Sequence, residues 1–146
     1  MNDLPISVGD QVTFSKTVSE SDVYLFAGIT GDLSPNHVDA EFMRHTAYGK
    51  RMAHGALLVG YMSHCSTAIL VNKNSPGETP VSLGYDRIRF IAPVFIGDTI
   101  TVTYRIESVD QVKRESRAAI AVRNQDDQVC AVATHILRWV SNPTQK

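Results

Sequence analysis

One segment of this chain, residues 55–71, is apolar around almost its whole circumference when it is drawn as a helix. The apolar residues at helical spacing are Leu57, Leu58, Tyr61, Met62, Cys65 and Ile69. Ala56, Val59 and Ala68 extend this surface to nearly every side, which is typical of a buried helix. At about 1.5 Å per residue such a helix is roughly 25 Å long. The segment therefore predicts a central helix against which the rest of the chain packs.

The second half of the chain alternates between apolar and polar side chains with a period of two. Within residues 99–106, the apolar side chains that point one way are Ile100, Val102, Tyr104 and Ile106. This alternation indicates a half-buried strand. Further strands are expected over residues 79–90 and 129–140, with polar turns at Gly97–Asp98 and 124–128. One long helix against a mostly antiparallel sheet is an α+β fold, and such a sheet could wrap the helix.

The first half, up to about residue 71, is expected to be mainly helical. Ser19 and Asp22 form a capping-box pattern that would satisfy the free N–H groups of a first helical turn. The buried face that follows at helical spacing consists of Val23, Phe26, Ala27 and Thr30. Gly31 can adopt the left-handed conformation that ends a helix. A short second helix is expected over residues 39–45.

The composition is that of a soluble globular protein. The chain has 146 residues, 43% of them hydrophobic and 20% charged, and a formal net charge of −1. This length fits a single domain, residues 1–146, that buries its own core. Because basic side chains are not in excess, nucleic acid is not expected as the main partner.

The two cysteines, Cys65 and Cys130, are far apart and have no metal-binding spacing, so both are expected to be reduced core residues. The first residues lack the basic and apolar runs of a secretory signal. The longest apolar stretch, residues 56–71, is interrupted by small and polar residues and falls short of a membrane span. A cytoplasmic protein that does not span a membrane is expected.

The most unusual chemistry lies in residues 31–39, which read Gly-Asp-Leu-Ser-Pro-Asn-His-Val-Asp. Pro35 fixes its own φ angle and restricts Ser34, so this loop can be stiff without regular hydrogen bonds. A tight loop could aim Asp32 and His37 into one pocket, where the pair could handle two proton transfers on one water molecule. The alternative is a helix-capping aspartate and a packed histidine, and the residues alone leave both interpretations open.

This loop resembles the signature of the MaoC-like dehydratases, also called the (R)-specific enoyl-CoA hydratases or hydratase 2 family. The signature is Gly-Asp-x-(Asn/Ser)-Pro-x-His, followed by a His-Gly pair that opens the long helix. The matching residues are Gly31, Asp32, Ser34, Pro35 and His37, and then His54 and Gly55. Residues 93–98 also resemble the turn between two late strands of the family. Ser34 stands where many members carry Asn.

The resemblance implies a hot-dog fold, in which an antiparallel sheet wraps the helix that begins near Gly55. It implies that Asp32 and His37 activate the water that adds to the β-carbon of a 2-enoyl thioester. Ser63 matches a serine that braces this pair, and Gly31, Ser34 and Pro35 belong to the loop that meets the substrate. The family works as dimers with the acyl-CoA substrate in a cleft at the interface, so a homodimer or a higher oligomer is expected.

The chemistry agrees with these assignments. Addition of water to a 2-enoyl thioester places negative charge on the carbonyl oxygen, and the Gly55 N–H at a helix N-terminus would stabilise that charge. A side chain at position 55 would crowd the thioester. No metal and no organic cofactor is expected, because conjugation with the thioester already activates the alkene, and the CoA is part of the substrate.

Several alternatives stay open at this point. A hot-dog acyl-CoA thioesterase would share the fold, and a non-catalytic acyl-CoA-binding subunit would share the cleft. His37, Asp39 and His45 could form a metal site, although their spacing matches no metal motif. His54 is interpreted as a hydrogen-bonded support for the loop, and His135 as a structural residue. The acyl chain length, the choice between CoA and acyl-carrier-protein thioesters, and the direction of the reaction are not readable from the sequence.

Overall fold

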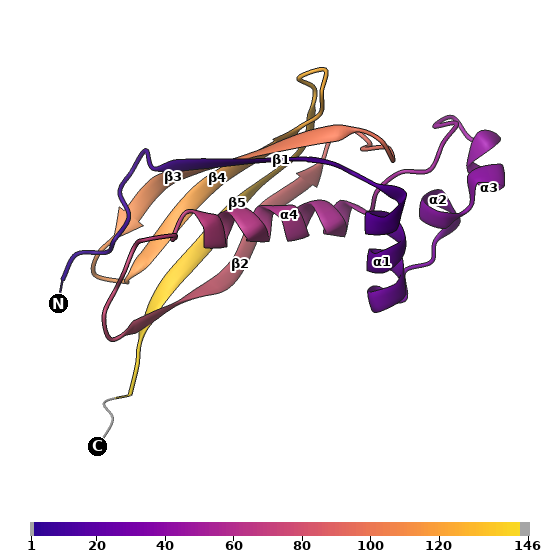
Figure 1. Ribbon diagram of the computed structural model, residues 1–146. Helices are drawn as coiled ribbons and strands as arrows, with labels where there is room; N and C mark the ends of the chain where they lie inside the picture. Colours follow the sequence, from indigo (N-terminus) through magenta and orange to yellow (C-terminus); the bar gives the residue numbers. More distant parts are fainter. Residues whose placement is uncertain (1, 144–146) are drawn as a thin grey trace.

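The computed structural model describes residues 2–143, in which one antiparallel sheet of five strands curves over a single long helix (Figure 1). In chain order the elements are β1 (Gln11–Thr17), α1 (Glu20–Thr30), α2 (Pro35–Val38), α3 (Ala40–Arg44), α4 (Gly55–Ala68), β2 (Glu78–Phe90), β3 (Thr99–Asp110), β4 (Glu115–Arg123) and β5 (Val129–Ser141). The strands lie in the order β1-β3-β4-β5-β2, so β1 and β2 form the two edges. This is the α+β hot-dog arrangement that the resemblance implies.

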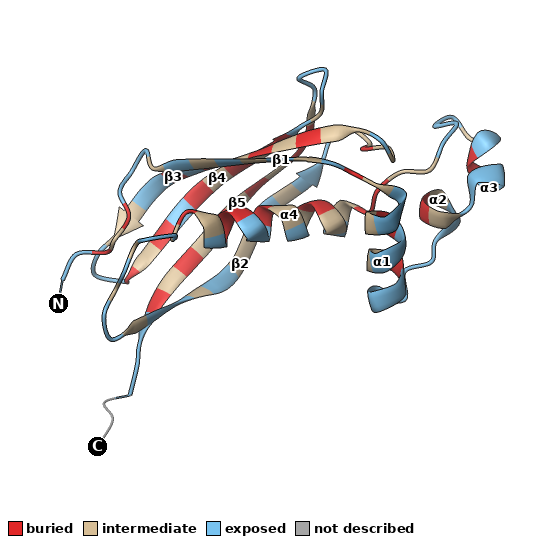
Figure 2. Ribbon diagram, viewed as in Figure 1, coloured by how far each residue is buried: buried red, intermediate tan, exposed pale blue. Residues whose placement is uncertain are grey.

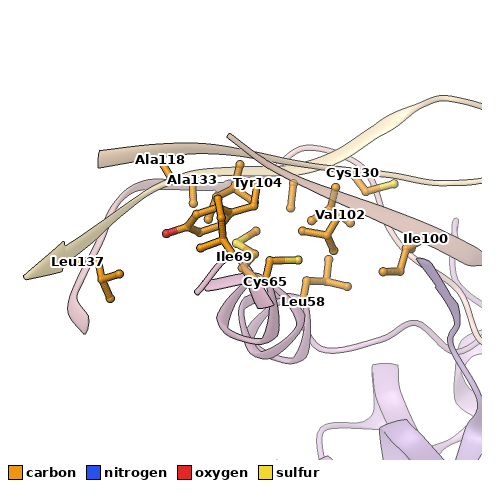
Figure 3. Packing of buried hydrophobic residues seen from close by; sticks show 14 of the residues in the cluster. Leu58, Cys65, Ile69, Ile100, Val102, Tyr104, Ala118, Cys130, Ala133 and Leu137 are labelled. Carbon is orange, nitrogen blue, oxygen red and sulfur yellow. The ribbon is translucent and has the colours of Figure 1, made fainter. Parts of the chain in front are cut away.

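The main core lies between α4 and the inner face of the sheet. Leu58 and Cys65 of α4 point toward Val102 and Tyr104 of β3 (Figure 3). The alternation predicted for β3 is confirmed, because its inner residues are at most 1% exposed. Both cysteines are buried and free, and burial raises the pKa of the Cys65 thiol to about 11. The expectation of reduced core cysteines is therefore confirmed.

The central helix is shorter and less buried than its sequence indicates. It ends at Ala68 instead of Val71, with Ile69 as its C-cap. The sheet covers only one of its sides, so the opposite side stays exposed (Figure 2). The exposed residues, called here the open face of α4, are Ala56, Gly60, Ser63, His64 and Thr67. The prediction of burial on nearly every side is wrong for a single copy of the chain, because these side chains stay exposed to solvent among residues 2–143.

The first half of the chain is not as helical as expected, because it begins with a strand. Residues Gln11–Thr17 form β1, which pairs antiparallel with β3. Only Val12 and Phe14 alternate with polar residues there, a pattern too short to stand out from a loop. The strand nevertheless matters for the site, because it leads directly into α1 at the end of the sheet where the loop chemistry lies.

The caps of helix α1 are as its sequence predicts, but its predicted buried face is only partly confirmed, because Val23 and Ala27 are buried whereas Thr30 is exposed. The Asp22 N–H donates to the Ser19 hydroxyl at 3.1 Å, and the Ser19 N–H donates to the Asp22 carboxylate at 2.9 Å. Gly31 closes the helix in the left-handed region, at φ 79°. The short helix expected near residues 39–45 is α3, with Asp39 and His45 as its caps. Within residues 2–143, no helix combines the length and the apolar character needed to cross a bilayer.

Candidate active site

The loop after α1 is more regular than its composition suggests. Pro35 starts the short helix α2, where its fixed φ angle suits the first helical position. The His37 N–H donates to the Ser34 carbonyl at 2.9 Å, and the Asp39 N–H donates to the Pro35 carbonyl at 3.0 Å. The loop was expected to be stiff without regular hydrogen bonds. It does contain regular helical hydrogen bonds, so this part of the expectation is wrong. This helical turn directs the His37 side chain toward the protein interior.

His37 is held in one orientation by a backbone carbonyl. Its ring is 8% exposed, and its Nδ1 lies 2.8 Å from the Met52 carbonyl oxygen. A carbonyl oxygen can only accept, so Nδ1 carries the hydrogen and donates it. In the neutral ring this leaves the lone pair on Nε2. His37 is thus prepared to accept a proton at Nε2.

His54 supports both His37 and the loop. Its ring stacks on the His37 ring with a centroid separation of 3.6 Å. Its Nε2 donates to the Asp32 carbonyl oxygen at 3.0 Å and lies 4.0 Å from a carboxylate oxygen of the same residue. The side chain is only 2% exposed, so this contact is shielded from water. The interpretation of His54 as a hydrogen-bonded support is confirmed.

Asp32 and His37 converge in the structure. A carboxylate oxygen of Asp32 and one ring nitrogen each of His37 and His54 lie within 4.8 Å of one another. One water molecule can bridge a carboxylate and an imidazole at that separation. The Asp32 side chain is 53% exposed, whereas His37 is buried, so the carboxylate faces the solvent side of the pair. The two groups that the sequence singled out therefore share one site.

The same three side chains are the part of the described chain best placed to hold a metal ion. Two imidazole nitrogens and a carboxylate oxygen are a donor set that transition metals accept. This group differs from the trio of His37, Asp39 and His45 considered from the sequence, since the convergent residues are Asp32, His37 and His54. The expectation that the protein uses no metal stays a prediction.

A pocket of about 360 Å³ opens beside His37 and the first turn of α4. Its wall includes the side chains of His37, Leu58 and Phe90, and it reaches the backbone of Gly55. The wall is mostly apolar, and its polar side chains are those of Asn36, His37 and Tyr48. Asp32 lies outside this wall, at the exposed edge of the histidine pair. An acyl group in the pocket would meet His37 on one side and the N-terminus of α4 on another.

Gly55 is the first residue of α4, as expected, and its N–H points out of the helix end. His54 provides no side-chain cap there, and among residues 2–143 no hydrogen-bond acceptor is assigned to the Gly55 N–H. The structure also gives a reason for glycine within the chain itself. A Cβ at position 55 would lie 2.6 Å from the ring of Phe90, far inside contact distance. Sequence reasoning missed Phe90, because no local pattern links it to the loop.

The other candidate residues lie farther from the pocket. Gly31, Ser34 and Pro35 are exposed and shape the loop without lining the pocket, and the Ser34 N–H donates to the Asp32 carboxylate at 3.4 Å. Ser63 lies on the open face of α4, in a second pocket of about 610 Å³ that it shares with Ser66. Within one copy of the chain, Ser63 therefore does not line the His37 pocket, and its bracing role stays a prediction.

Comparison with known proteins identifies the family. Residues 5–128 match the family described as the MaoC-like domain. The chain belongs to the MaoC-like domain family. This MaoC-like protein is 35% identical over 109 residues to an (R)-specific enoyl-CoA hydratase of Rhodospirillum rubrum, covering 75% of this chain and 72% of the relative. It is 32% identical over 124 residues to a 3-hydroxybutyryl-CoA dehydratase of Methylorubrum extorquens, covering 85% and 75%.

Solved structures agree on the fold of the MaoC-like protein. The (R)-hydratase from A. caviae involved in PHA biosynthesis superposes with a TM-score of 0.79 at 25% sequence identity. The match covers 94% of this chain and 98% of that chain. The hot-dog arrangement is thus shared along almost the full length of both proteins.

Proposed function

We propose that this MaoC-like protein is an (R)-specific enoyl-CoA hydratase and 3-hydroxyacyl-CoA dehydratase, which adds water reversibly to a trans-2-enoyl thioester. The relatives named above support the reaction class. The convergence of the Asp32 carboxylate with the His37 ring beside an apolar pocket is the observation that carries the proposal. The pocket takes the acyl group, and the pair takes the water.

The proposed addition begins with one water molecule between Asp32 and His37. His37 accepts a proton at Nε2, because its Nδ1 hydrogen is committed to the Met52 carbonyl. The water oxygen forms its bond to the β-carbon while the alkene electrons move toward the thioester. The α-carbon then takes a proton from the pair, which gives the 3-hydroxyacyl thioester. General acid–base assistance of this kind contributes about 10²–10⁴-fold to a rate.

The thioester oxygen gains negative charge during this addition. The Gly55 N–H at the start of α4 is the proposed donor to that oxygen, and the positive end of the helix dipole adds to its effect. One such donor is worth roughly 2.7–4 kcal/mol of activation free energy. No metal or organic cofactor takes part in the proposed mechanism, because conjugation polarises the alkene and backbone N–H groups stabilise the charge.

The proposed working form is a homodimer with the acyl-CoA in a cleft at the interface. Two surfaces of the single chain support it. The edge strand β2 presents unpaired backbone groups, which favour pairing with another strand. The open face of α4, including Gly60 and Ser63, offers small side chains that allow close approach of a second copy.

Hydration of crotonyl-CoA tests the function, because the conjugated absorbance disappears as water adds. The wild-type protein is expected to hydrate crotonyl-CoA and to give the (R)-3-hydroxy product on chiral analysis. Asp32→Ala and His37→Ala are each expected to lower kcat/KM by roughly 10² or more, the contribution of general acid–base assistance. Both variants should keep the wild-type far-UV circular dichroism spectrum.

The same assay separates the competing functions. Release of CoA with a free thiol, while the alkene stays intact, would indicate a thioesterase. Binding of the thioester without turnover would indicate a non-catalytic subunit. Near-normal turnover in both alanine variants would refute the assignment of the pair.

A further inference from the structure

Phe90 occupies an unusual position for an exposed aromatic residue. It is the last residue of β2 and is 56% exposed, yet its ring occupies the space that a Cβ at position 55 would need, 2.6 Å from where that atom would lie. The next residue holds the end of β2 on β5, because the Ile91 N–H donates to the Cys130 carbonyl at 2.8 Å. The backbone that carries Phe90 is therefore fixed, while its ring borders the pocket.

A β-bulge directs this ring toward the helix. The register of β2 against β5 shifts between Asp86 and Arg89, and Arg87 within the shift has φ 54°. Because side chains alternate between the two faces of a strand, such a shift sends the following residues to the opposite face. A left-handed backbone at a non-glycine residue is uncommon and marks a constrained position. The sheet thus departs from regular pairing just before Phe90.

The ring lies beside the position that the reacting part of the bound substrate takes in the proposed mechanism. In the proposed mechanism the thioester oxygen meets the Gly55 N–H, and the β-carbon meets the water on Asp32 and His37. The α-carbon lies between these two points. The Phe90 ring fills the space beside the Cα of Gly55 that a Cβ would occupy, and it lines the same pocket as His37, so it would form the wall beside that carbon.

We propose that Phe90 is a specificity-determining residue, whose ring against Gly55 limits the width of the pocket and excludes acyl groups substituted at the α-carbon. This inference rests on the proposed hydratase function. Glycine at position 55 and Phe90 then depend on each other, because the ring occupies the space that a Cβ at position 55 would need. The ring in turn keeps the pocket narrow for unbranched 2-enoyl groups.

Selectivity between two thioesters tests this proposal. The probes are crotonyl-CoA and trans-2-methylcrotonyl-CoA, which differ by one methyl group on the α-carbon. Phe90→Ala is expected to raise the ratio of kcat/KM for the branched over the unbranched substrate by roughly tenfold or more, the usual effect of one methyl-sized group in an apolar pocket. Phe90→Leu should raise it less. A ratio within about twofold of wild type would overturn the proposal.

Phe42→Ala provides a matched control for the selectivity experiment. Phe42 lies on α3, is 51% exposed and does not line the His37 pocket. The same change of side chain there is expected to leave the substrate ratio unchanged. Absence of hydration in the wild-type protein would refute the proposed function. Hydration with an unaltered ratio in Phe90→Ala would refute only the assignment of Phe90.

A double-mutant cycle tests the Gly55–Phe90 contact without relying on activity. Gly55→Ala places a Cβ 2.6 Å from the Phe90 ring and forces the ring to move, so it is expected to lower the thermal midpoint in the wild-type background. The same change in the Phe90→Ala background removes the clash and should cause no comparable loss. If Gly55→Ala does not fold alone, folding of the double variant gives the same result. Equal destabilisation in both backgrounds would overturn the proposed pairing.

Discussion

At the scale of single residues, backbone carbonyls decide what the two site histidines can do. The Met52 carbonyl holds the hydrogen of His37 on Nδ1, and the Asp32 carbonyl holds that of His54 on Nε2. The free lone pair of the neutral His37 ring is thereby left on Nε2, whereas the donor of His54 is used to hold the loop. Two neighbouring imidazoles thus have different roles because their acceptors differ.

A third histidine, His135, lies far from this site and is fully buried in β5. Its two ring nitrogens contact the hydroxyl groups of Tyr104 at 2.7 Å and Ser82 at 2.8 Å. Burial penalises the charged ring and lowers the pKa of His135 to about 4 from an ordinary value of 6.5. The interpretation of His135 as a structural residue is confirmed by these contacts.

This buried histidine predicts a pH dependence of stability. In the unfolded chain His135 takes up a proton below about pH 6.5, whereas in the folded protein it stays neutral down to about pH 4. The unfolded state therefore binds more protons between these values, and the free energy of unfolding should fall by up to about 3 kcal/mol as the pH drops through this window. Urea unfolding at a series of pH values measures this decrease in the free energy of unfolding.

His135→Gln is the control for this dependence, because glutamine does not titrate. The difference in unfolding free energy between wild type and variant should shrink as the pH falls from 6.5 to 4. The comparison also removes the contributions of carboxyl groups, which both proteins share. A constant difference across the window would contradict the prediction.

At the scale of elements, the helix caps show how closely local sequence can specify structure. The capping box at Ser19 and Asp22 and the left-handed Gly31 were predictable, because each depends on residues within one helical turn. The alternating strands were also predictable from neighbouring residues, because their period of two is visible over a few positions. The strand β1 was missed because it is short, and α2 was missed because four residues carry too little periodicity.

The cap of α1 yields a prediction about stability. Ser19→Ala removes the hydroxyl that accepts the Asp22 N–H, so it should lower the free energy of unfolding by about 1 kcal/mol. Ser19→Thr keeps a hydroxyl and should stay within about 0.5 kcal/mol of wild type. Urea denaturation with unchanged slope measures both values. Equal stability of all three proteins would show that the cap contributes nothing.

At the scale of the whole molecule, the single chain leaves its central helix half covered. The sheet buries one side of α4, and the open face with Gly60 and Ser63 remains exposed (Figure 2). A helix with so many apolar residues usually has a partner on each side. Among the described residues, β2 pairs only with β5 and leaves its other edge open for a second strand. Both features support the proposed homodimer.

A glycine on the open face allows a direct test of this dimer. No atom of residues 2–143 lies within 4 Å of the position that a Cβ would take at Gly60, so Gly60→Glu fits a single chain and improves helix propensity. If a second copy covers the open face, the buried carboxylate should instead dissociate the dimer. Light scattering is expected to give about 32 kDa for wild type, twice the 16.1 kDa of one chain, and the monomer mass for the variant.

Gly28→Glu is the matched control, because Gly28 is an exposed helical glycine of α1 with equally free space around its Cα. This variant should keep the wild-type mass. A wild-type protein that behaves as a monomer, or a Gly60→Glu variant that remains dimeric, would contradict an interface on the open face.

The sequence by itself determined most helices and strands, the caps of α1, and the loop that carries Asp32 and His37, although β1 and α2 were missed. Those features depend on neighbours within a few residues, whose spacing is visible in the chain. Only the tertiary structure decided that Phe90 would lie on Gly55 and that one face of α4 would stay open. Each of these depends on how the sheet packs on the helix, which brings together residues that share no local pattern.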